Sequence, residues 1–381
     1  MTKDFSRLIG KSLQCPRLEG SATTSMEESM SGILDVAKKA GVSASTVSNV
    51  INGRHEKMRP ETKRRVLEAI EQLKYTPNIA ARQLKSGQSC SIGLIIPSVA
   101  NPFWGLVAHH VERAARQRGY RLMICNAERD PDVETRYAEA MLGSGITGII
   151  LGSSPLSFDY LRDLTARGLK VAAFDQRVNE TRDVITCGVS VDHELGGALA
   201  AQHLIGLGHK RIATVSGPIR TNSRIGRING VRMAMARAGL PLRDEMIWQG
   251  GGVAGFGDLE GAELGRMGVR ELLSRDDPPT GIVAINDMYA LGAYAGARDL
   301  GFRVPDDISI VGFDDIVLAE IAQPALTTIR QPVPAMTEML VRMLVAHVEG
   351  SVPADEPAFI DVTPQLIVRG STTAARILQP A

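Results

Sequence analysis

Apolar residues between positions 33 and 73 recur at the three- and four-residue spacing of a buried helix face. The spacing predicts three short helices: one that ends at Gly41, a second that Ser43 caps, and a third that begins near Pro60 and ends before Tyr75. Glycine suits the left-handed backbone that commonly follows a helix, and a serine hydroxyl suits the backbone N–H groups at a helix start. We therefore expect a small all-α unit here.

After Ser89 the pattern changes to apolar runs of strand length, each followed by an amphipathic helix. The runs are residues 91–97, 121–126, 148–151, 171–174, 212–215, 282–285 and 308–313. Wholly apolar strands that alternate with helices are typical of parallel sheets covered on both faces. Because residues 89–381 exceed what one such sheet usually holds, we expect an α/β unit with two lobes.

Residues 1–31 lack this periodicity and are rich in Ser, Thr and Met, so we expect a flexible tail. Met26 and Met30 stand shortly before the first patterned segment. Translation that starts at one of them is a hypothesis, and it would leave the tail out of the native protein.

The composition of all 381 residues, 44% hydrophobic and 22% charged, is that of a folded globular protein and excludes a disordered or collagen-like chain. No apolar run approaches the roughly 20 residues of a membrane span, so we expect neither export nor a membrane partner. The four cysteines lie far apart, which favours free thiols in a reducing cytoplasm. They are Cys15, Cys90, Cys125 and Cys187.

The net charge of +1 hides an uneven distribution along the chain. Residues 32–88 hold 11 Lys/Arg against 5 Asp/Glu, whereas the residues after 88 hold 28 against 33. A cationic module on a mildly acidic body suits a polyanion partner, because each neutralised phosphate releases counterions. A solvated charged surface is the ordinary alternative.

The second predicted helix has a small, polar outer face once Val47, Val50 and Ile51 are buried. A short helix set off from its predecessor by a tight turn fits the helix-turn-helix geometry, in which the second helix enters the DNA major groove. Candidates for base or phosphate contacts are Ser43, Ala44, Ser45, Thr46, Ser48, Asn49 and Asn52. The alternative is a helical hairpin with a solvated face, and the local positive charge favours DNA.

Residues 78–85 are helix-prone but too short to be stable alone, so we expect them to fold only against a partner. Between Arg82 and Lys85, the apolar side chain of Leu84 is a candidate wedge between base steps of the minor groove. The alternative is an ordinary linker in which Leu84 packs on the larger unit.

Polar and aromatic residues follow several predicted strands, at the strand ends where open α/β sheets bind ligands. The candidates are Asn101, Phe103, Trp104, Asp175, Arg177, Ser223, Arg224, Arg227 and Asp287. Taken singly, each has an ordinary structural explanation as a helix cap, a core residue or a surface charge. Together they suit a polyol, because carboxylates and guanidinium groups bond hydroxyls and aromatic faces cover C–H surfaces. We expect a sugar or sugar derivative as the ligand.

Signals of catalysis are weak in this sequence. Gly10-Lys11-Ser12 lacks the first glycine of a phosphate loop, no GxSxG motif occurs, and the histidines show no metal-ligand spacing. We therefore expect no catalytic residues, no metal and no cofactor.

Several segments, in order, resemble the LacI-type transcriptional repressors: LDVAKKAGVSASTVSNVING, RPETKRRVLEAIEQLKYTPNIAARQLKSG, IGLIIPSVANPFW, VDHELGGALAAQHLIGLGHKRIATVSGP and AINDMYALGAYAGARDLGFRVPDDISIVGFDD. The resemblance implies a helix-turn-helix headpiece in residues 32–77 and a hinge helix in residues 78–88. It also implies a periplasmic-binding-protein-like core of two lobes with parallel sheets in residues 89–381, which binds an effector and dimerises. Only residues 1–31 fall outside it.

The resemblance also implies roles for individual residues. It places Asn101, Trp104, Asp175 and Asp287 at effector contacts and supports the wedge role of Leu84. The arginine pattern departs from the R-x-R-x-x-G of many members, because Ile225 stands where they have the first arginine. Whether Arg224 or Arg227 reaches the ligand therefore stays open.

The interpretation of the whole sequence is a cytoplasmic, nucleoid-associated homodimer that represses transcription. It would bind a pseudo-palindromic double-stranded DNA operator under the control of a small effector. The rival classes are a solute-binding receptor for sugar uptake, which would share the two-lobed core, and a sugar-acting cleft enzyme. The basic headpiece argues against the first rival, and the lack of a recognisable nucleophile or acid–base pair argues against the second.

Overall fold

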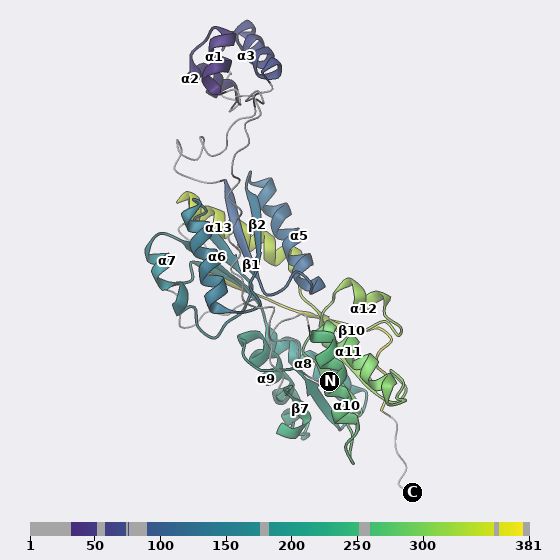
Figure 1. The fold of residues 1–381 in the computed structure, drawn as a ribbon. Helices are drawn as coiled ribbons and strands as arrows, with labels where there is room; N and C mark the ends of the chain where they lie inside the picture. Colours follow the sequence, from purple (N-terminus) through teal and green to yellow (C-terminus); the bar gives the residue numbers. More distant parts are fainter. Residues whose placement is uncertain are drawn as a thin grey trace, which may run out of the picture. The chain divides into compact units, whose positions relative to one another are not determined.

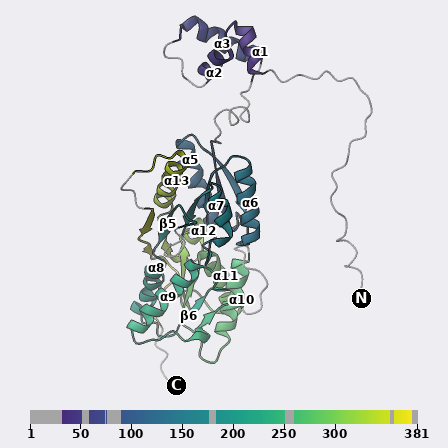
Figure 2. The same ribbon diagram turned by 90° about the vertical axis from the view of Figure 1, so that its left-hand side faces the viewer.

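The computed structural model describes residues 32–51, 58–73, 75, 90–175, 183–250, 260–353 and 358–375. The chain divides into two compact units between Lys85 and Ser86, and each is described by itself (Figures 1 and 2). The predicted tail, residues 1–31, and the predicted hinge, residues 78–88, lie outside the described residues.

Three helices form the described part of the first unit. They are α1 (Ile33–Ala40), α2 (Ala44–Ile51) and α3 (Pro60–Gln72). Gly41 ends α1 in the left-handed conformation, with a φ of 63°. The fully buried Val36, Val47 and Val66 form the centre of a small core. The helical periodicity therefore predicted the three helices and the side chains that pack between them.

A six-stranded sheet forms the first lobe of the second unit, with the strand order β11-β5-β4-β3-β1-β2. All neighbouring strands in it are parallel. The strands are β1 (Ser91–Ile96), β2 (Arg121–Asn126), β3 (Gly148–Leu151), β4 (Lys170–Phe174), β5 (Cys187–Val191) and β11 (Phe359–Val362).

The second lobe repeats this topology in the order β12-β10-β9-β8-β6-β7. Only β12 is antiparallel to its neighbour, β10. The strands are β6 (Ile212–Val215), β7 (Ile247–Trp248), β8 (Gly281–Ala284), β9 (Ser309–Asp314), β10 (Thr327–Arg330) and β12 (Gln365–Ile367). The seven apolar runs thus became β1, β2, β3, β4, β6, β8 and β9, and the expectation of two α/β lobes is confirmed.

Helices cover both faces of each sheet (Figures 1 and 2). The first lobe holds α5 (Pro102–Gln117), α6 (Pro131–Gly143), the 3₁₀ turn η1 (Asp159–Leu161), α7 (Arg162–Ala166) and α13 (Val333–Glu349). The second lobe holds α8 (His193–Gly206), α9 (Asn222–Arg237), the 3₁₀ turn η2 (Asp244–Met246), α10 (Gly261–Leu273), α11 (Asp287–Asp299) and α12 (Val317–Ile321). No helix in the described part of the chain is both long and apolar enough to span a membrane.

The chain passes between the two lobes at residues 191–193, 330–333 and 362–365. In the first sheet the strand order reverses between β1 and β3, and in the second between β6 and β8. Ligands of open α/β sheets bind beyond the carboxyl ends of the strands at such reversals. The topology therefore predicts a ligand site at the loops that follow β1, β3, β6 and β8.

Candidate functional site

The outer face of α2 carries small polar side chains. The Ser43 hydroxyl accepts a hydrogen bond from the Thr46 backbone N–H at 3.2 Å, which makes Ser43 the cap of this helix. Ser45 and Asn49 are exposed, whereas Val47 and Val50 pack into the core of the unit. Ala44, Thr46 and Ser48 are half-buried.

The first helical unit therefore presents the face that the sequence predicted. The exposed side chains of α2 are short, and a helix with short side chains can approach DNA closely in the major groove. The predicted DNA contacts Asn52, Arg82, Leu84 and Lys85 lie outside the described residues.

A pocket lies between the two lobes of the second unit, at the carboxyl ends of the strands. The space within it is about 30 Å³. The loops after β1, β3 and β8 contribute lining residues, as the topology indicated. The loop after β6 contributes none, and the first turns of α9, which follows that loop, line the pocket instead. The lining residues are Asn101, Phe103, Trp104, Arg129, Gly152, Ser154, Asp175, Ser223, Arg224, Arg227, Ile285, Asn286 and Asp314.

Aromatic side chains form the wall that the first lobe contributes. Phe103 and Trp104 stand in the first turn of α5, where Asn101 caps the helix by accepting a hydrogen bond from the Phe103 N–H at 3.1 Å. The two rings meet edge to face with their centroids 5.2 Å apart, and Phe174 lies behind both. A Cβ atom at Gly152 would lie 2.6 Å from the Trp104 ring, so the indole requires a glycine there.

Asp175 carries the first lobe's negative charge into the pocket. It follows β4 with a φ of 63°, a left-handed conformation that aspartate tolerates better than most residues. One carboxylate oxygen lies 2.8 Å from Nε2 of His193, and the other lies 3.8 Å from Nη2 of Arg227. Burial favours the neutral carboxyl, but His193 and Arg227 together lower the pKa of Asp175 below its ordinary value.

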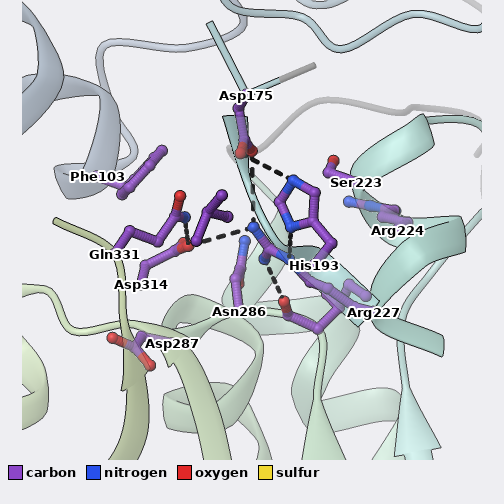
Figure 3. Close-up of polar contacts among 12 residues, drawn as sticks. Phe103, Asp175, His193, Ser223, Arg224, Arg227, Asn286, Asp287, Asp314 and Gln331 are labelled. Atoms are coloured by element: carbon purple, nitrogen blue, oxygen red, sulfur yellow. Dashed lines mark hydrogen bonds and ion pairs between the residues drawn. The ribbon is translucent and has the colours of Figure 1, made fainter. Parts of the chain in front are cut away.

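Arg227 connects the residues at the floor of the pocket (Figure 3). Its guanidinium donates to Nδ1 of His193 at 3.2 Å and to the Ile285 carbonyl at 2.6 Å, and lies 3.5 Å from Asp314. The same guanidinium stacks on the Phe313 ring, 3.6 Å from its centroid. Arg227 therefore pairs with a carboxylate from each lobe.

His193 is held in one tautomer by these contacts. An arginine only donates hydrogen bonds, so Nδ1 of His193 must accept from Arg227. The ring hydrogen must then be on Nε2, the nitrogen that lies 2.8 Å from Asp175. The imidazole then has no lone pair with which to take a proton from a substrate. The arrangement suits binding rather than general base catalysis.

Arg224 and Ser223 line the pocket from the first turn of α9. Arg224 is buried, donates to the Pro218 carbonyl at 2.8 Å and lies over the Tyr289 ring, 5.5 Å from its centroid. The sequence left open which arginine reaches the ligand site. In the structure both Arg224 and Arg227 line it.

The structure corrects the expectation for Asp287. Its side chain is fully buried and does not line the pocket, whereas its neighbour Asn286 does (Figure 3). Asp287 accepts hydrogen bonds from the Thr328 hydroxyl at 2.6 Å and the Ile316 N–H at 2.9 Å, which join α11 to β10 and to the residues after β9. Burial, and then the nearby Asp314, raise the pKa of Asp287 well above its ordinary value. Arg177 lies outside the described residues.

Sequence reasoning missed several residues of this site and of its surroundings, among them Arg129, His193, Asp314 and Gln331. Gln331 donates to Asp314 at 2.8 Å and so supports the carboxylate that faces Arg227. Asp314 is the last residue of β9, and Gln331 directly follows β10. This position at a strand end is the signal that could have found them. His193 begins α8 two residues after the end of β5, so it has a similar position at a strand end. Its contact with Asp175, which follows β4, depends on how the lobes pack.

The described residues contain no group of three or more His, Cys, Asp or Glu side chains that could hold a metal ion. The described cysteines, Cys90, Cys125 and Cys187, are free thiols, as predicted. A helical unit with a small polar outer face on α2 and a two-lobed α/β unit with a polar pocket between its lobes are the parts of an effector-controlled DNA-binding regulator.

Comparisons with known proteins agree with this class. Residues 32–78 match the bacterial regulatory proteins of the lacI family, and residues 201–372 match a periplasmic binding protein-like domain. The HTH-type transcriptional regulator DegA of Bacillus subtilis (strain 168) is 35% identical over 345 residues, which span 90% of this chain and 98% of DegA.

Two solved structures extend the likeness to the fold. The Lac repressor dimer bound to operator and the anti-inducer ONPF is 27% identical, with a TM-score of 0.77 over 90% of this chain and 99% of that chain. The transcriptional regulator CelR in complex with cellobiose is 28% identical, with a TM-score of 0.66 and the same coverage of both chains.

The chain belongs to the lacI family of bacterial regulatory proteins. It is accordingly a DNA-binding transcriptional regulator with an effector-binding core, and not an enzyme.

Proposed function

We propose that this protein is a homodimeric repressor that binds a pseudo-palindromic operator and changes its operator affinity when a sugar or sugar derivative occupies the pocket between its lobes. The observation that carries the proposal is the network of Asp175, Arg227 and Asp314, which joins the two lobes through the ligand site.

The outer face of α2 supports the DNA-binding part of the proposal. Ser45 and Asn49 are exposed on the helix that follows the tight turn, and asparagine is suited to pair with adenine. The operator complex of the Lac repressor dimer supports two headpieces that read two half-sites.

Contacts across the lobes support a coupling between ligand and lobe position. Asn222, at the start of α9, donates to the carbonyls of Ser154 at 3.2 Å and Pro155 at 2.8 Å in the other lobe. The enclosed space of about 30 Å³ is far below the roughly 300 to 1,000 Å³ of common small-molecule pockets. A ligand must therefore separate these contacts in order to enter, and its binding shifts the equilibrium between lobe arrangements.

Residues 78–88 are the segment through which we propose that this shift reaches DNA. In a dimer two copies would fold together on the minor groove or come apart, and Leu84 would be the wedge between base steps. The protein would act in the cytoplasm, on the bacterial nucleoid. The cellobiose complex of CelR supports a carbohydrate effector.

Fluorescence anisotropy with an operator selected from random duplexes tests the DNA-binding part. We expect Asn49→Ala to weaken binding to the selected operator by about 1–3 kcal/mol and to relax the preference at one base pair. Gln72→Ala, an exposed position on α3, is the matched control and should bind like the unchanged protein. Equal binding of the selected and random duplexes by the unchanged protein would contradict the proposal.

Analytical ultracentrifugation with and without the operator tests the dimer. We expect one dimer per palindromic duplex, and one monomer per duplex would contradict this assembly. Leu84→Ala should weaken operator binding much more than binding to random duplex, whereas equal losses would argue against the wedge.

A further inference from the structure

We infer that His193 is a positioning residue of the effector site, which holds Arg227 in place only while its imidazole is uncharged, so that effector affinity falls on acidification. The inference rests on the proposed function, because it concerns an effector in the same pocket. It adds a response to pH to the proposed response to a ligand and assigns that response to one side chain.

His193 stands where the chain first crosses from one lobe to the other, as the first residue of α8. Only 8% of its side-chain surface is exposed, and its ring lies between Asp175 of the first lobe and Arg227 of the second (Figure 3). The ring does not line the pocket, whereas both of these neighbours do. His193 therefore acts on a ligand through the residues that it contacts.

The contacts of Arg227 show what depends on His193. Nε of Arg227 donates to Nδ1 of His193 at 3.2 Å, and Nη1 donates to the Ile285 carbonyl at 2.6 Å. With Nε and Nη1 held in this way, Nη2 lies 3.8 Å from Asp175 and 3.5 Å from Asp314. Nδ1 of His193 therefore helps to fix the orientation in which Arg227 meets a carboxylate from each lobe.

Close packing of α8 on α9 fixes the ring in this place. A Cβ atom at Gly226 of α9 would lie 2.8 Å from Cβ of His193. A Cβ atom at Gly197 of α8 would lie 2.0 Å from the Arg227 carbonyl oxygen. Both distances are too short for a side chain, so the two helices can approach this closely only because glycine stands at both positions.

The Nδ1 lone pair can accept a hydrogen bond from Arg227 or bind a proton, but it cannot do both. After protonation, an N–H group on Nδ1 would face the N–H group of Arg227 across 3.2 Å, and two positive charges would be in contact. Protonation of His193 therefore removes the acceptor that holds Nε of Arg227.

The same proton affects Asp175. Oδ1 of Asp175 lies 2.8 Å from Nε2 of His193 but has no hydrogen-bond partner among the described residues, so it is an acceptor for a ligand hydroxyl group. A charged imidazole would attract this carboxylate more strongly than a neutral one and compete with the ligand for it. Both consequences of protonation lower the affinity for a polyol.

The charged groups around the ring are Arg227 on α9, Asp175 after β4 and, beyond the guanidinium, Asp314 at the end of β9. Burial opposes ionisation of Asp175, but His193 and Arg227 lower its pKa, so it keeps its charge where histidines titrate, between about pH 5 and pH 8. Burial, and then Asp314, raise the pKa of Asp287 well above its ordinary value. Asp287 is therefore the second titratable group that an experiment must separate from His193.

Isothermal titration calorimetry with the full chain tests the inference. A panel of ribose, glucose, galactose, cellobiose and lactose at about pH 8 first identifies a sugar that binds, and its affinity is then measured down to about pH 5 at constant ionic strength. The same titration in two buffers of different ionisation enthalpy gives the number of protons released on binding. Circular dichroism at each pH confirms that the protein is folded.

We expect the affinity to fall by at least about tenfold between these limits, and by no more than about tenfold per pH unit, because one proton is involved. Sugar binding should release up to one proton at the acidic end, since the sugar favours the uncharged ring. An affinity that stays constant or rises on acidification would overturn the inference and leave the proposed function intact.

Two variants separate the role of Nδ1 from that of the shape of the ring. His193→Asn keeps an acceptor near the position of Nδ1 but does not titrate, so it should bind the sugar within about threefold of the unchanged protein at pH 8 and lose the pH dependence. His193→Phe keeps a ring without nitrogen atoms and should bind at least about tenfold more weakly at every pH. Normal binding by His193→Phe, or an unchanged pH dependence in His193→Asn, would contradict the positioning role.

His203→Asn is the matched control on the same helix, because that half-buried ring bonds to Thr372 and lies away from the pocket residues. It should keep both the affinity and the pH dependence. Asp287→Asn should keep the pH dependence as well, and a profile that disappears there but persists in His193→Asn would assign the response to Asp287 and overturn the inference. If His193→Phe does not fold, His193→Asn and the profile of the unchanged protein decide the question.

Native mass spectrometry after incubation with a bacterial metabolite extract extends the panel, and a retained compound of any class can replace the sugar in the pH series. A protein that retains no compound from the panel or the extract at any pH would overturn the proposed effector control, and the inference with it. Loss of the pH response alone leaves that control in place, so the two failures are distinguishable.

Discussion

The outer face of α2 and the pocket between the lobes are built in opposite ways. The α2 face is local: eight consecutive residues in one helix supply it, and Ser45 and Asn49 stand exposed to solvent. The residues of the pocket lie far apart in the sequence, between Asn101 and Asp314, and come from both lobes. Four of its five charged side chains are buried: Asp175, Arg224, Arg227 and Asp314.

This difference shows how the two sites depend on the rest of the protein. A local face needs only a helix that is correctly capped and packed. A buried charged pocket needs many contacts to be right at once, because a buried charge without its partner costs far more than an exposed one. Substitutions should therefore act on α2 mainly through DNA affinity and on the pocket mainly through folding stability.

The largest effect is expected for Arg227→Met, which would leave the buried Asp175 and Asp314 without their shared guanidinium. We expect the free energy of unfolding of the second unit to fall by roughly 3–5 kcal/mol. Both tryptophans, Trp104 and Trp248, belong to that unit, so urea unfolding followed by tryptophan fluorescence measures it alone. A loss no larger than that of Arg232→Met, an exposed position on the same helix, would refute the structural role of the network.

A smaller effect is expected for Val47→Ala in the core of the helical unit. Val47 is fully buried, and removal of its two methyl groups should destabilise that unit by about 2 kcal/mol and lower operator affinity with it. Tryptophan fluorescence should report unchanged unfolding of the second unit. A shift in that signal would mean that the two units are energetically coupled.

The pair Ser43→Ala and Ser45→Ala sharpens the contrast within α2 itself. Loss of the Ser43 cap should cost the helical unit about 1 kcal/mol of stability. Ser45→Ala leaves the cap in place, so circular dichroism should show stability within about 0.5 kcal/mol of the unchanged protein while operator affinity falls. The opposite pattern would mean that Ser45, and not Ser43, maintains the helix.

The smallest effect is a pH dependence at Asp175. Its folded pKa lies below the ordinary value of 3.8, so the stability it contributes is present above that value and is lost as the pH falls through the folded pKa. Urea midpoints of the unchanged protein and Asp175→Asn should therefore converge on acidification, in a series from about pH 6 to pH 3. Midpoints that separate further at low pH would show that the carboxylate is not stabilised by His193 and Arg227.

The strands show how far the sequence could predict the fold. Uninterrupted apolar runs identified seven of the strands, but β5, β7, β10, β11 and β12 were missed. In β10, Thr327 and Thr328 look polar in the sequence, yet both are fully buried and bonded through their hydroxyls. Their strand conformation depends on pairing with β9, which local patterning does not encode.

The candidate site was also predicted only in part, because local patterning does not determine which way each side chain points. Asn101, Phe103, Trp104, Asp175, Ser223, Arg224 and Arg227 line the pocket as the strand-end argument suggested. Asp287 follows a strand end just as closely, but the turn into α11 directs Asn286 to the pocket and Asp287 into the second lobe. One step along a chain that enters a helix changes the direction of a side chain by roughly 100°, so residue spacing alone could not separate these neighbours.

The sequence by itself determined the three short helices, the alternation of apolar strands with helices, the polar face of α2 and the strand ends near which ligand residues lie. These features depend on contacts between residues a few positions apart, and hydrophobic periodicity records such contacts directly. The tertiary structure alone brought His193 of the second lobe to Asp175 of the first and set Arg227 between two carboxylates. Those contacts join residues that are 18, 52 and 87 positions apart in the chain, and only the packing of both sheets determines which side chains meet.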